Sequence, residues 1–361
     1  MARPHPNARG GDKRPKSAPP PRERERPQRQ GADDERIIPV AVLGLGHVGR
    51  QIALAARAHP RLELVGALDR DSNLVGKPLG ALLDDPTIDL TVARDLASIQ
   101  SKLRGGVLLI ATTSRVDEIA PQLEAAFKAG LHVVSSCEEL AYPWLYHDEI
   151  ADRIDAAARR ANVCAVGTGV NPGFVLDRLV AAAGACTGKI VRVQAERVVD
   201  ARNRRNALLQ KVGAGLSEDA FDARAERDEI GHVGLAESCA LAALGLGLDC
   251  DEVEEELAPV IAEEDVPGVV PVKAGQVAGV YQSARGFSEG REVVRLELTI
   301  AAGAEPAGDH IHIEGEPNVD LRIEGGMPGE AATAWAVVNC VPSVVRSEPG
   351  LLTVLDLPSG R

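Results

Sequence analysis

The sequence predicts a two-domain α/β protein, a class indicated by its length and by two patterns of apolar residues. The 361 residues suffice for two domains that each bury a core. Short apolar runs alternate with helix-like segments over residues 37–170, as in a parallel sheet covered by helices. From Lys189 the runs are longer, and apolar and polar residues alternate. We therefore expect an α+β domain with a mostly antiparallel sheet over 171–328, and a helical segment within 329–361 that packs back on the first domain.

Residues 1–36 differ from the rest of the chain. They are rich in proline and arginine and lack apolar periodicity, so we expect this leader to be disordered. The leader holds ten Lys/Arg and six Asp/Glu, a net charge of +4, and the formal total of −13 therefore leaves about −17 for the remainder. An acidic body argues against an enzyme that acts on nucleic acids.

The chain shows no sign of export or of insertion into a membrane. The leader lacks the apolar core of a secretory signal, and no apolar run reaches the ~18 residues of a membrane helix. Six scattered cysteines without a CxxC pair indicate reduced, mostly buried thiols. We expect a soluble, cytoplasmic protein.

The first strand, turn and helix carry the clearest ligand signal. An apolar run ends at Leu43, and the glycine-rich sequence 44–49 leads from it into an alanine-rich helix. In this pattern the first glycine permits a tight turn, the second lets the backbone approach a pyrophosphate, and the third lets the helix pack on the strand. The helix start offers free N–H groups to the phosphates. The pattern predicts a Rossmann dinucleotide-binding domain; a turn that binds no ligand is the alternative. The predicted cofactor-binding residues here are Gly44, Gly46, His47, Val48 and Gly49.

A second apolar run ends at Asp69, twenty residues beyond Gly49. A carboxylate there would accept hydrogen bonds from the adenosine ribose hydroxyls and would repel a 2′-phosphate. Arg70 would instead attract that phosphate. NAD and NADP both stay open as cofactors, with NAD slightly favoured.

Polar residues follow two further strands. Thr112, Thr113 and Ser114 come at the end of one apolar run, and Glu138 and Glu139 come shortly after the next. In open α/β sheets, ligands bind beyond the carboxyl ends of the strands. The three hydroxyl residues would line the nicotinamide ribose or cap the helix that follows, and the two roles are compatible.

The two glutamates stand directly before an aromatic cluster. Three of the nine aromatic residues of the chain, Tyr142, Trp144 and Tyr146, lie within five positions. Apolar rings beside a carboxylate at this sheet edge suit a small-molecule pocket, in which we include Tyr142 and Trp144. The alternative is that these rings pack the junction between the domains.

A fixed carboxylate suits oxidation at a carbon that bears nitrogen. Loss of hydride from such a carbon leaves an iminium cation, which a nearby negative charge stabilises. The carboxylate also accepts a proton from the ammonium group or from attacking water. Oxidation of an alcohol would instead need a base such as His or Lys, and this segment holds no lysine. The pattern favours C–N over C–O chemistry; a helix cap or a surface position is the alternative for either glutamate.

Two other clusters allow more than one interpretation. The basic residues within 202–211 would hold a substrate carboxylate or cofactor phosphates, or pair with acidic residues across a subunit contact. His310 and His312 would share one face of a strand, but with His232 they lack the usual ligand spacing of a zinc site. We expect no bound metal.

Several segments carry a family resemblance. They are Cys137-Glu138-Glu139-Leu140 with Tyr142-Pro143, Gly167-Thr168-Gly169-Val170-Asn171-Pro172-Gly173-Phe174, Arg204-Arg205 through Leu209-Gln210-Lys211 with Gly213-Ala214-Gly215, Gly231-His232-Val233-Gly234 with Glu237-Ser238, and Pro349-Gly350-Leu351-Leu352-Thr353. Together they resemble the 2,4-diaminopentanoate dehydrogenases and the related native NAD(P)-dependent amine dehydrogenases, within the wider group of dihydrodipicolinate-reductase-like oxidoreductases. The resemblance covers nearly everything after residue 37.

The resemblance implies a homodimer with a nicotinamide cofactor in the first domain. It implies reversible oxidative deamination of a primary amine to a ketone with release of ammonia, on a small aliphatic amine or on 2,4-diaminopentanoate. The catalytic glutamate maps to Glu138, with Glu139 as the reserve, and the residues under the nicotinamide map to Asn171, Pro172 and Phe174.

Three other functions remain to be distinguished from this one. The paired-histidine and lysine signature of the dihydrodipicolinate reductases has no counterpart here, so that activity is not expected. Another NAD(P)-dependent imine or carbonyl reductase of amino-acid metabolism is one alternative. A non-catalytic sensor that binds NAD(H) is the other.

Overall fold

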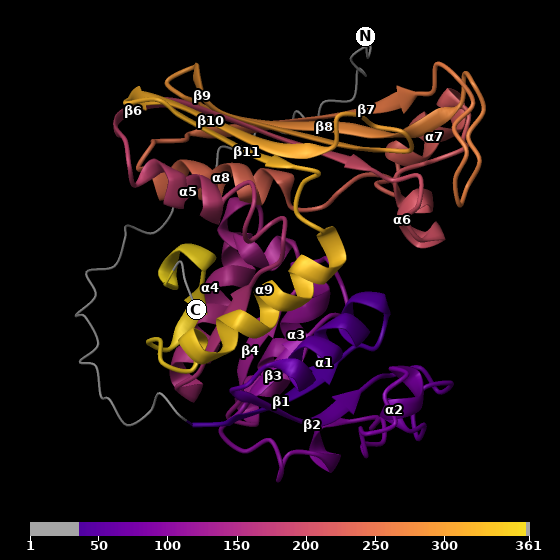
Figure 1. Ribbon diagram of the computed structural model, residues 1–361. Coiled ribbons are helices and arrows are strands. Elements are labelled where there is room, and N and C mark those ends of the chain that lie inside the picture. The colour runs from indigo at the N-terminus through magenta and orange to yellow at the C-terminus, as the bar shows by residue number, and fades with distance from the viewer. Residues whose placement is uncertain (1–35, 359–361) are drawn as a thin grey trace. The chain divides into compact units, whose positions relative to one another are not determined.

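The computed structural model describes residues 36–358, which form two compact units. One unit consists of residues 36–174 and 328–358, and the other of residues 175–327. The leader predicted over 1–36 lies outside the described residues, apart from Arg36. The predicted fold class, a parallel-sheet α/β domain with a second, mostly antiparallel domain, is confirmed (Figure 1).

A six-stranded parallel sheet forms the centre of the first unit. Its strand order is β12-β5-β4-β3-β1-β2, and every neighbouring pair is parallel. The strands are β1 (Ile38–Leu43), β2 (Leu62–Leu68), β3 (Val107–Ile110), β4 (His132–Ser135), β5 (Cys164–Gly167) and β12 (Gly350–Leu352). All residues of β3 and β5 are buried, which explains their unbroken apolar sequences.

Helices cover both faces of this sheet. The strand order proceeds from β1 to β2 in one direction and from β3 to β5 in the other, and right-handed crossovers therefore place α1 and α3 on opposite faces. α9 packs on α1 and on β3, β4 and β5, while α4 packs on α3 and β12. The helices are α1 (His47–Ala58), α3 (Val116–Lys128), α4 (Asp148–Ala161) and α9 (Gly329–Val344).

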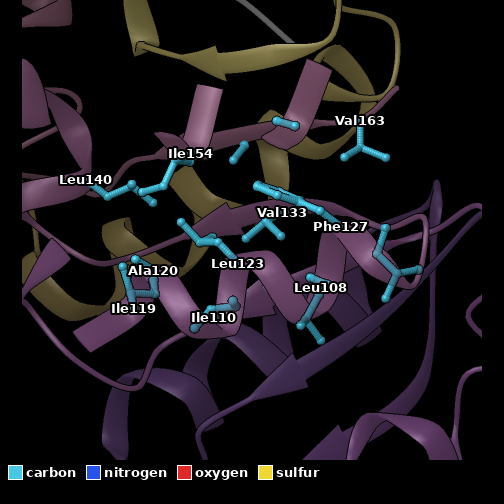
Figure 2. Close-up of a cluster of buried hydrophobic side chains, with 14 of the residues drawn as sticks. Leu108, Ile110, Ile119, Ala120, Leu123, Phe127, Val133, Leu140, Ile154 and Val163 are labelled. Carbon is cyan, nitrogen blue, oxygen red and sulfur yellow. The ribbon is translucent and has the colours of Figure 1, made fainter. Parts of the chain in front are cut away.

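An aliphatic core lies between the sheet and the layer of α3 and α4. Leu123 and Phe127 from α3 lie beside Val133 from β4, and none of the three is more than 3% exposed (Figure 2). Ile154 of α4 completes this layer and is fully buried. The apolar residues of α3 recur three or four positions apart, so one face of the helix is buried while the other meets solvent.

Two segments of the first unit differ from the sequence interpretation. The sequence between the turn at 75–80 and Leu103 has an amphipathic pattern, but it forms only α2 (Leu79–Leu82) and one 3-10 turn at Leu96–Ser98. β12 is missing from the sequence predictions, because three residues are too few to show a strand by periodicity.

The second unit is built on a six-stranded sheet in the order β11-β10-β6-β9-β8-β7. Neighbouring strands are antiparallel except β6 and β9, which are parallel. The strands are β6 (Gly188–Asp200), β7 (Glu252–Ile261), β8 (Val277–Ser288), β9 (Arg291–Ala301), β10 (Gly308–Glu316) and β11 (Val319–Glu324). β7 was not expected, because a run of glutamates from Glu254 to Glu256 interrupts its alternation.

Two helices of this unit, α5 (Arg178–Gly184) and α8 (Leu235–Leu246), pack on each other, and α8 packs on β7, β8 and β9 (Figure 1). Two shorter helices are α6 (Asn206–Lys211) and α7 (Glu218–Ala225). The sequence from Glu229 to Leu246 predicts one helix, but in the structure α8 begins only at Leu235. Gly231 and Gly234 adopt φ angles of +119° and +101°, which are incompatible with a continuous helix.

The six cysteines are free, and four of them are buried, as predicted. No helix within residues 36–358 combines the length and the apolar character that a membrane span requires.

Candidate active site

The carboxyl ends of β1 to β5 meet at one edge of the first unit's sheet. The residue after a strand donates its N–H to the last carbonyl of a neighbouring strand in four places: Gly44 to Leu68 (2.9 Å), Ala111 to Leu43 (2.9 Å), Ser136 to Ile110 (3.0 Å) and Thr168 to Ser135 (2.8 Å). These bonds bring the polar segments after the strands to one level. The direction of chain progression reverses between β1 and β3, and ligands of open α/β sheets bind at such a point.

The turn after β1 has the geometry of a dinucleotide-binding turn. Gly44 has a φ of +93°, and a Cβ there would lie 2.6 Å from the carbonyl oxygen of Ala111. A Cβ on Gly49 would overlap the carbonyl oxygen of Gly44, so only glycine lets α1 approach the turn. Gly46 is exposed, and nothing lies within 4 Å of its Cβ position. It precedes α1 without a side-chain cap, so the turn offers an open approach to helical N–H groups.

Asp69 contacts this turn from the end of β2. Its Oδ2 accepts a hydrogen bond from Leu45 N (2.7 Å), and its Oδ1 accepts one from Asp71 N (2.9 Å). The carboxylate therefore joins the carboxyl end of β2 to the glycine turn. Arg70, the next residue, is exposed.

α9 also reaches the glycine turn. His47 Nε2 lies 2.8 Å from Glu330 Oε2, a contact between the first residue of α1 and the first turn of α9. Val48, beside His47, is half-buried. Sequence reasoning missed Glu330, because no local pattern connects the two ends of this unit.

The hydroxyl residues after β3 bond to side chains of α3. Thr112 Oγ1 donates to Gln122 Oε1 (2.9 Å), and Thr113 Oγ1 donates to Glu118 Oε2. Neither hydroxyl accepts the first helical N–H of α3, which belongs to Val116 and bonds to Glu139. Thr113 Oγ1 instead accepts a hydrogen bond from Arg115 N (3.2 Å), the residue directly before the helix, so this hydroxyl contacts the start of α3 without bonding to its first helical N–H.

Glu139 is a buried residue with a full set of partners. It is 5% exposed, its Oε2 accepts a hydrogen bond from Val116 N (2.8 Å), and its Oε1 accepts one from Arg115 Nη1 (2.7 Å). His147 Nε2 lies 3.6 Å from Oε2. The positive end of the α3 dipole adds to this stabilisation of a carboxylate. Sequence reasoning did not identify Arg115 and His147 as site residues. The only available signal is that Arg115 follows β3 and His147 follows β4, two neighbouring strands of the same sheet.

Glu138 stands next to this carboxylate and is half-buried. It precedes the 3-10 turn Glu139–Ala141, with its carbonyl accepting a hydrogen bond from Ala141 N (3.1 Å). Glu139 N donates to Ser114 O (3.2 Å), so the segments that follow β3 and β4 are joined at Glu139, directly after Glu138.

The aromatic residues pack against one another after this turn. The rings of Tyr142 and Trp144 have centroids 5.9 Å apart and are tilted by 54°. Trp144 packs on the aliphatic core, and its indole N–H lies 3.3 Å from Asp152 Oδ1 on α4. Tyr142 is 7% exposed and Tyr146 is exposed. Trp144 therefore packs within the first unit, on its core and on α4.

The glycine-rich segment after β5 lies against the turn that holds the glutamates. A Cβ on Gly167 would lie 2.5 Å from the carbonyl carbon of Leu140. Asn171 is 9% exposed, Pro172 is buried and Phe174 is half-buried. Thr333 Oγ1 of α9 accepts a hydrogen bond from Val170 N (3.1 Å), which fixes the start of this segment.

The basic cluster of the second unit is partly occupied by acidic partners within that unit. Arg202 donates to Asp200 Oδ2 (2.7 Å) and to Glu305 Oε1 (2.7 Å). Arg202 therefore has carboxylate partners without a substrate or a second subunit.

The two strand histidines share a carboxylate. His310 Nε2 and His312 Nδ1 lie 2.9 Å and 3.3 Å from Asp320 Oδ2. Hydrogen bonds from His310, Arg322 and His312 lower the pKa of Asp320 to about 2. No group of three or more histidine, cysteine or acidic residues suited to hold a metal occurs in the part of the chain that the structure describes.

Comparison with known families matches both halves of the chain. The 2,4-diaminopentanoate dehydrogenase C-terminal domain matches residues 174–361, slightly more than half of the chain, and the dihydrodipicolinate reductase N-terminus matches residues 38–137. The chain belongs to the 2,4-diaminopentanoate dehydrogenase family.

Relatives match this family member over nearly their whole length. A 2,4-diaminopentanoate dehydrogenase of Acetoanaerobium sticklandii is 27% identical over 90% of this chain and 94% of its own. An amine dehydrogenase of Streptomyces virginiae is 26% identical over 89% of this chain and 96% of its own. The structure of an amine dehydrogenase from Mycobacterium smegmatis has the same fold, with a TM-score of 0.79, 24% identity, and coverage of 90% of this chain and 97% of its own.

Alanine substitutions at Gly46 and Gly49 should separate cofactor binding from folding. Gly46→Ala should keep wild-type stability, since φ at Gly46 is −63° and its Cβ position is open, but it should weaken binding of NADH or NADPH. Gly49→Ala should lower the free energy of unfolding by about 1–3 kcal/mol, the usual cost of overpacking. Urea denaturation and fluorescence titration with the reduced cofactors measure the two effects. Equal loss of stability in both variants would contradict the geometry of the turn.

Proposed function

We propose that this chain is an NAD(P)-dependent amine dehydrogenase that converts a primary amine reversibly to a ketone and ammonia. The observation that carries the proposal is the position of Glu138, a carboxylate at the same sheet edge as the glycine turn. Membership of the 2,4-diaminopentanoate dehydrogenase family supports it, as do two relatives that bear the names of amine-oxidising enzymes.

The residues of the glycine turn fit a dinucleotide. The open face at Gly46 and the N–H groups of α1 would hold the pyrophosphate, and Asp69 would bind the adenosine ribose. Gly44, His47, Val48 and Gly49 complete the turn, and Thr112, Thr113 and Ser114 follow β3 at the same edge. When bound, the nicotinamide ring supplies hydride acceptance and donation. We propose NAD as the slightly favoured cofactor, because Asp69 lies against the turn while Arg70 is exposed.

Glu138 is assigned the chemical role. As the amine carbon is oxidised, its nitrogen becomes part of an iminium cation, and the Glu138 carboxylate stabilises that charge. The same carboxylate accepts a proton from the ammonium group and assists attack by water, which gives the ketone and ammonium. Glu139 is less suited to this role, because both of its oxygens accept hydrogen bonds from fixed donors.

The substrate is proposed as a small aliphatic amine or 2,4-diaminopentanoate. Tyr142, Asn171, Pro172 and Phe174 are proposed to line the substrate pocket, and Trp144 to support it from the core. Cofactor binding is assigned to residues 37–170, and substrate binding and dimerisation to residues 171–328.

The enzyme should oxidise NADH or NADPH only when both a ketone and ammonium are present. Small ketones and 2-amino-4-oxopentanoate, each tested with and without ammonium, identify the preferred substrate. Glu138→Gln should lower turnover by roughly 10²- to 10⁴-fold and leave cofactor affinity nearly unchanged, because it removes a positioned base without touching the glycine turn.

Glu149→Gln is the matched control, since Glu149 is exposed in the first turn of α4 and the same charge is removed there. It should keep wild-type turnover. Oxidation that does not require ammonium would point to another imine or carbonyl reductase. Cofactor binding without turnover would point to a sensor.

Asp69→Ser should raise the use of NADP relative to NAD. The change removes the negative charge that would repel a 2′-phosphate, while Arg70 remains beside the site. The ratio of kcat/KM for the two cofactors is the measurement. An unchanged ratio would show that Asp69 serves only to join β2 to the glycine turn.

We propose a homodimer that forms through the polar face of the second unit's sheet. On this face Tyr281 donates to Glu297 (2.5 Å), Arg285 pairs with Glu254 (2.5 Å), and the histidines pair with Asp320. Because these pairs already satisfy one another within the sheet, covering them with a second copy leaves none of their charges unpaired.

Charge reversal on this face should shift the protein towards monomers. Glu196 is exposed and lies opposite His310 on one side and Glu297 on the other, near the middle of the sheet. Glu196→Arg should lower the sedimentation coefficient at micromolar concentration, while Glu149→Arg should not. A monomeric wild-type protein would contradict the proposal outright.

A further inference from the structure

We propose that Glu139 is a positioning residue that fixes the catalytic glutamate beside it. The inference rests on the proposed role of Glu138. It concerns the Glu139 network, by which we mean Glu139 with its three partners Arg115, Val116 and His147.

Burial gives the network its strength. An ionised carboxylate that is 5% exposed is unstable in a protein unless donors replace the water that it has lost. Here the backbone N–H of Val116 and the guanidinium of Arg115 supply two charge-assisted hydrogen bonds of 2.8 Å and 2.7 Å. Val116 is itself fully buried, so its N–H cannot turn to solvent for another acceptor. The partners therefore hold the Glu139 side chain in one orientation.

The network joins the starts of two helices. Arg115 and Val116 begin α3, which follows β3, and His147 precedes α4, which follows β4. The backbone adds a further link, since Glu139 N donates to Ser114 O (3.2 Å). The short segment between β4 and α4 is thus attached to the neighbouring loop at both the side chain and the main chain of Glu139.

The orientation of Glu139 determines that of Glu138. The two residues are consecutive at the start of a 3-10 turn, and successive side chains in such a turn point about 120° apart. Because the Glu139 side chain points inward to α3, the Glu138 side chain is directed away from that helix. Glu138 has helical backbone angles, φ −67° and ψ −46°, and its carbonyl is bonded to Ala141 N, so little backbone freedom remains.

The chemistry of the two carboxylates also differs. A catalytic base must exchange its proton with the substrate, whereas both Glu139 oxygens already accept hydrogen bonds, one from Arg115 Nη1 and one from Val116 N. The neighbouring positive charge of Arg115 and the α3 dipole compensate the charge of Glu139 locally. A second carboxylate can therefore stand next to Glu138 without acting on the substrate.

A double-mutant cycle tests this positioning role. We would measure kcat, KM for the amine and the cofactor, and the melting temperature for Glu139→Gln, Glu138→Gln, the double variant and the control Glu149→Gln. The amide that replaces the Glu139 carboxylate keeps an acceptor for Val116 but loses the ion pair with Arg115. If Glu139 acts through Glu138, Glu139→Gln should lower kcat by roughly 10- to 100-fold in the wild-type background and by no more than about 2-fold in the Glu138→Gln background. Cofactor KM should hardly change.

Four results would overturn the inference. An equal fold-loss in both backgrounds would mean that Glu139 acts independently of Glu138, and an unchanged kcat in Glu139→Gln would mean that it positions nothing. If the wild-type enzyme converts no amine, both the proposed function and the inference are refuted. Near-normal turnover in Glu138→Gln would remove the catalytic assignment of Glu138 on which the inference rests, a result distinct from the first two.

Should Glu139→Gln fail to fold, Arg115→Gln serves in its place. The Arg115 side chain is 37% exposed, so its replacement disturbs packing less than replacement of the buried Glu139. It still removes the hydrogen bond from Arg115 to Glu139. The same pattern, a loss of kcat that disappears in the Glu138→Gln background, is expected with a smaller amplitude. Additive losses would overturn the inference here as well.

Discussion

The hydrogen bonds that extend the parallel sheet by one residue beyond its strands are the constraint on which the site depends. Gly44, Ala111, Ser136 and Thr168 each donate to the last carbonyl of an adjacent strand. The loops therefore leave the sheet at one level, and their side chains meet although they are far apart in the sequence. Without this common level, a glycine turn after β1 and a glutamate after β4 would be unrelated features.

Sequence reasoning predicts this edge well, because the relevant signals are local. The glycine turn and the short apolar strands are visible as fixed spacings and as continuous runs. The distinction between Glu138 and Glu139 is not visible in the same way. In one dimension the two residues are equivalent, and only the position of Arg115, which comes from another loop, shows which carboxylate is buried.

The remaining failures also have physical reasons. β7 is a strand whose glutamates suppress the apolar signal, and its place in the sheet comes from pairing with β8 rather than from its own composition. The start of α8 depends on backbone conformations at Gly231 and Gly234 that a helical pattern does not reveal. The sequence pattern assigns Trp144 to a pocket because it is an aromatic residue near a carboxylate. In the structure its ring packs on the aliphatic core, and its indole N–H lies beside Asp152.

The return of the chain to its first unit also bears on how the protein folds during synthesis. α9 covers one face of the parallel sheet and β12 forms its edge, yet both are made after the entire second unit. A ribosome that has released residues 36–174 has therefore produced a sheet with one edge strand missing and part of one face uncovered. Such an intermediate exposes apolar surface and an unpaired strand edge, the features that chaperones recognise and that promote aggregation. The second unit is contiguous in sequence and escapes this delay, so the later half of the polypeptide can reach its native packing before the earlier half does.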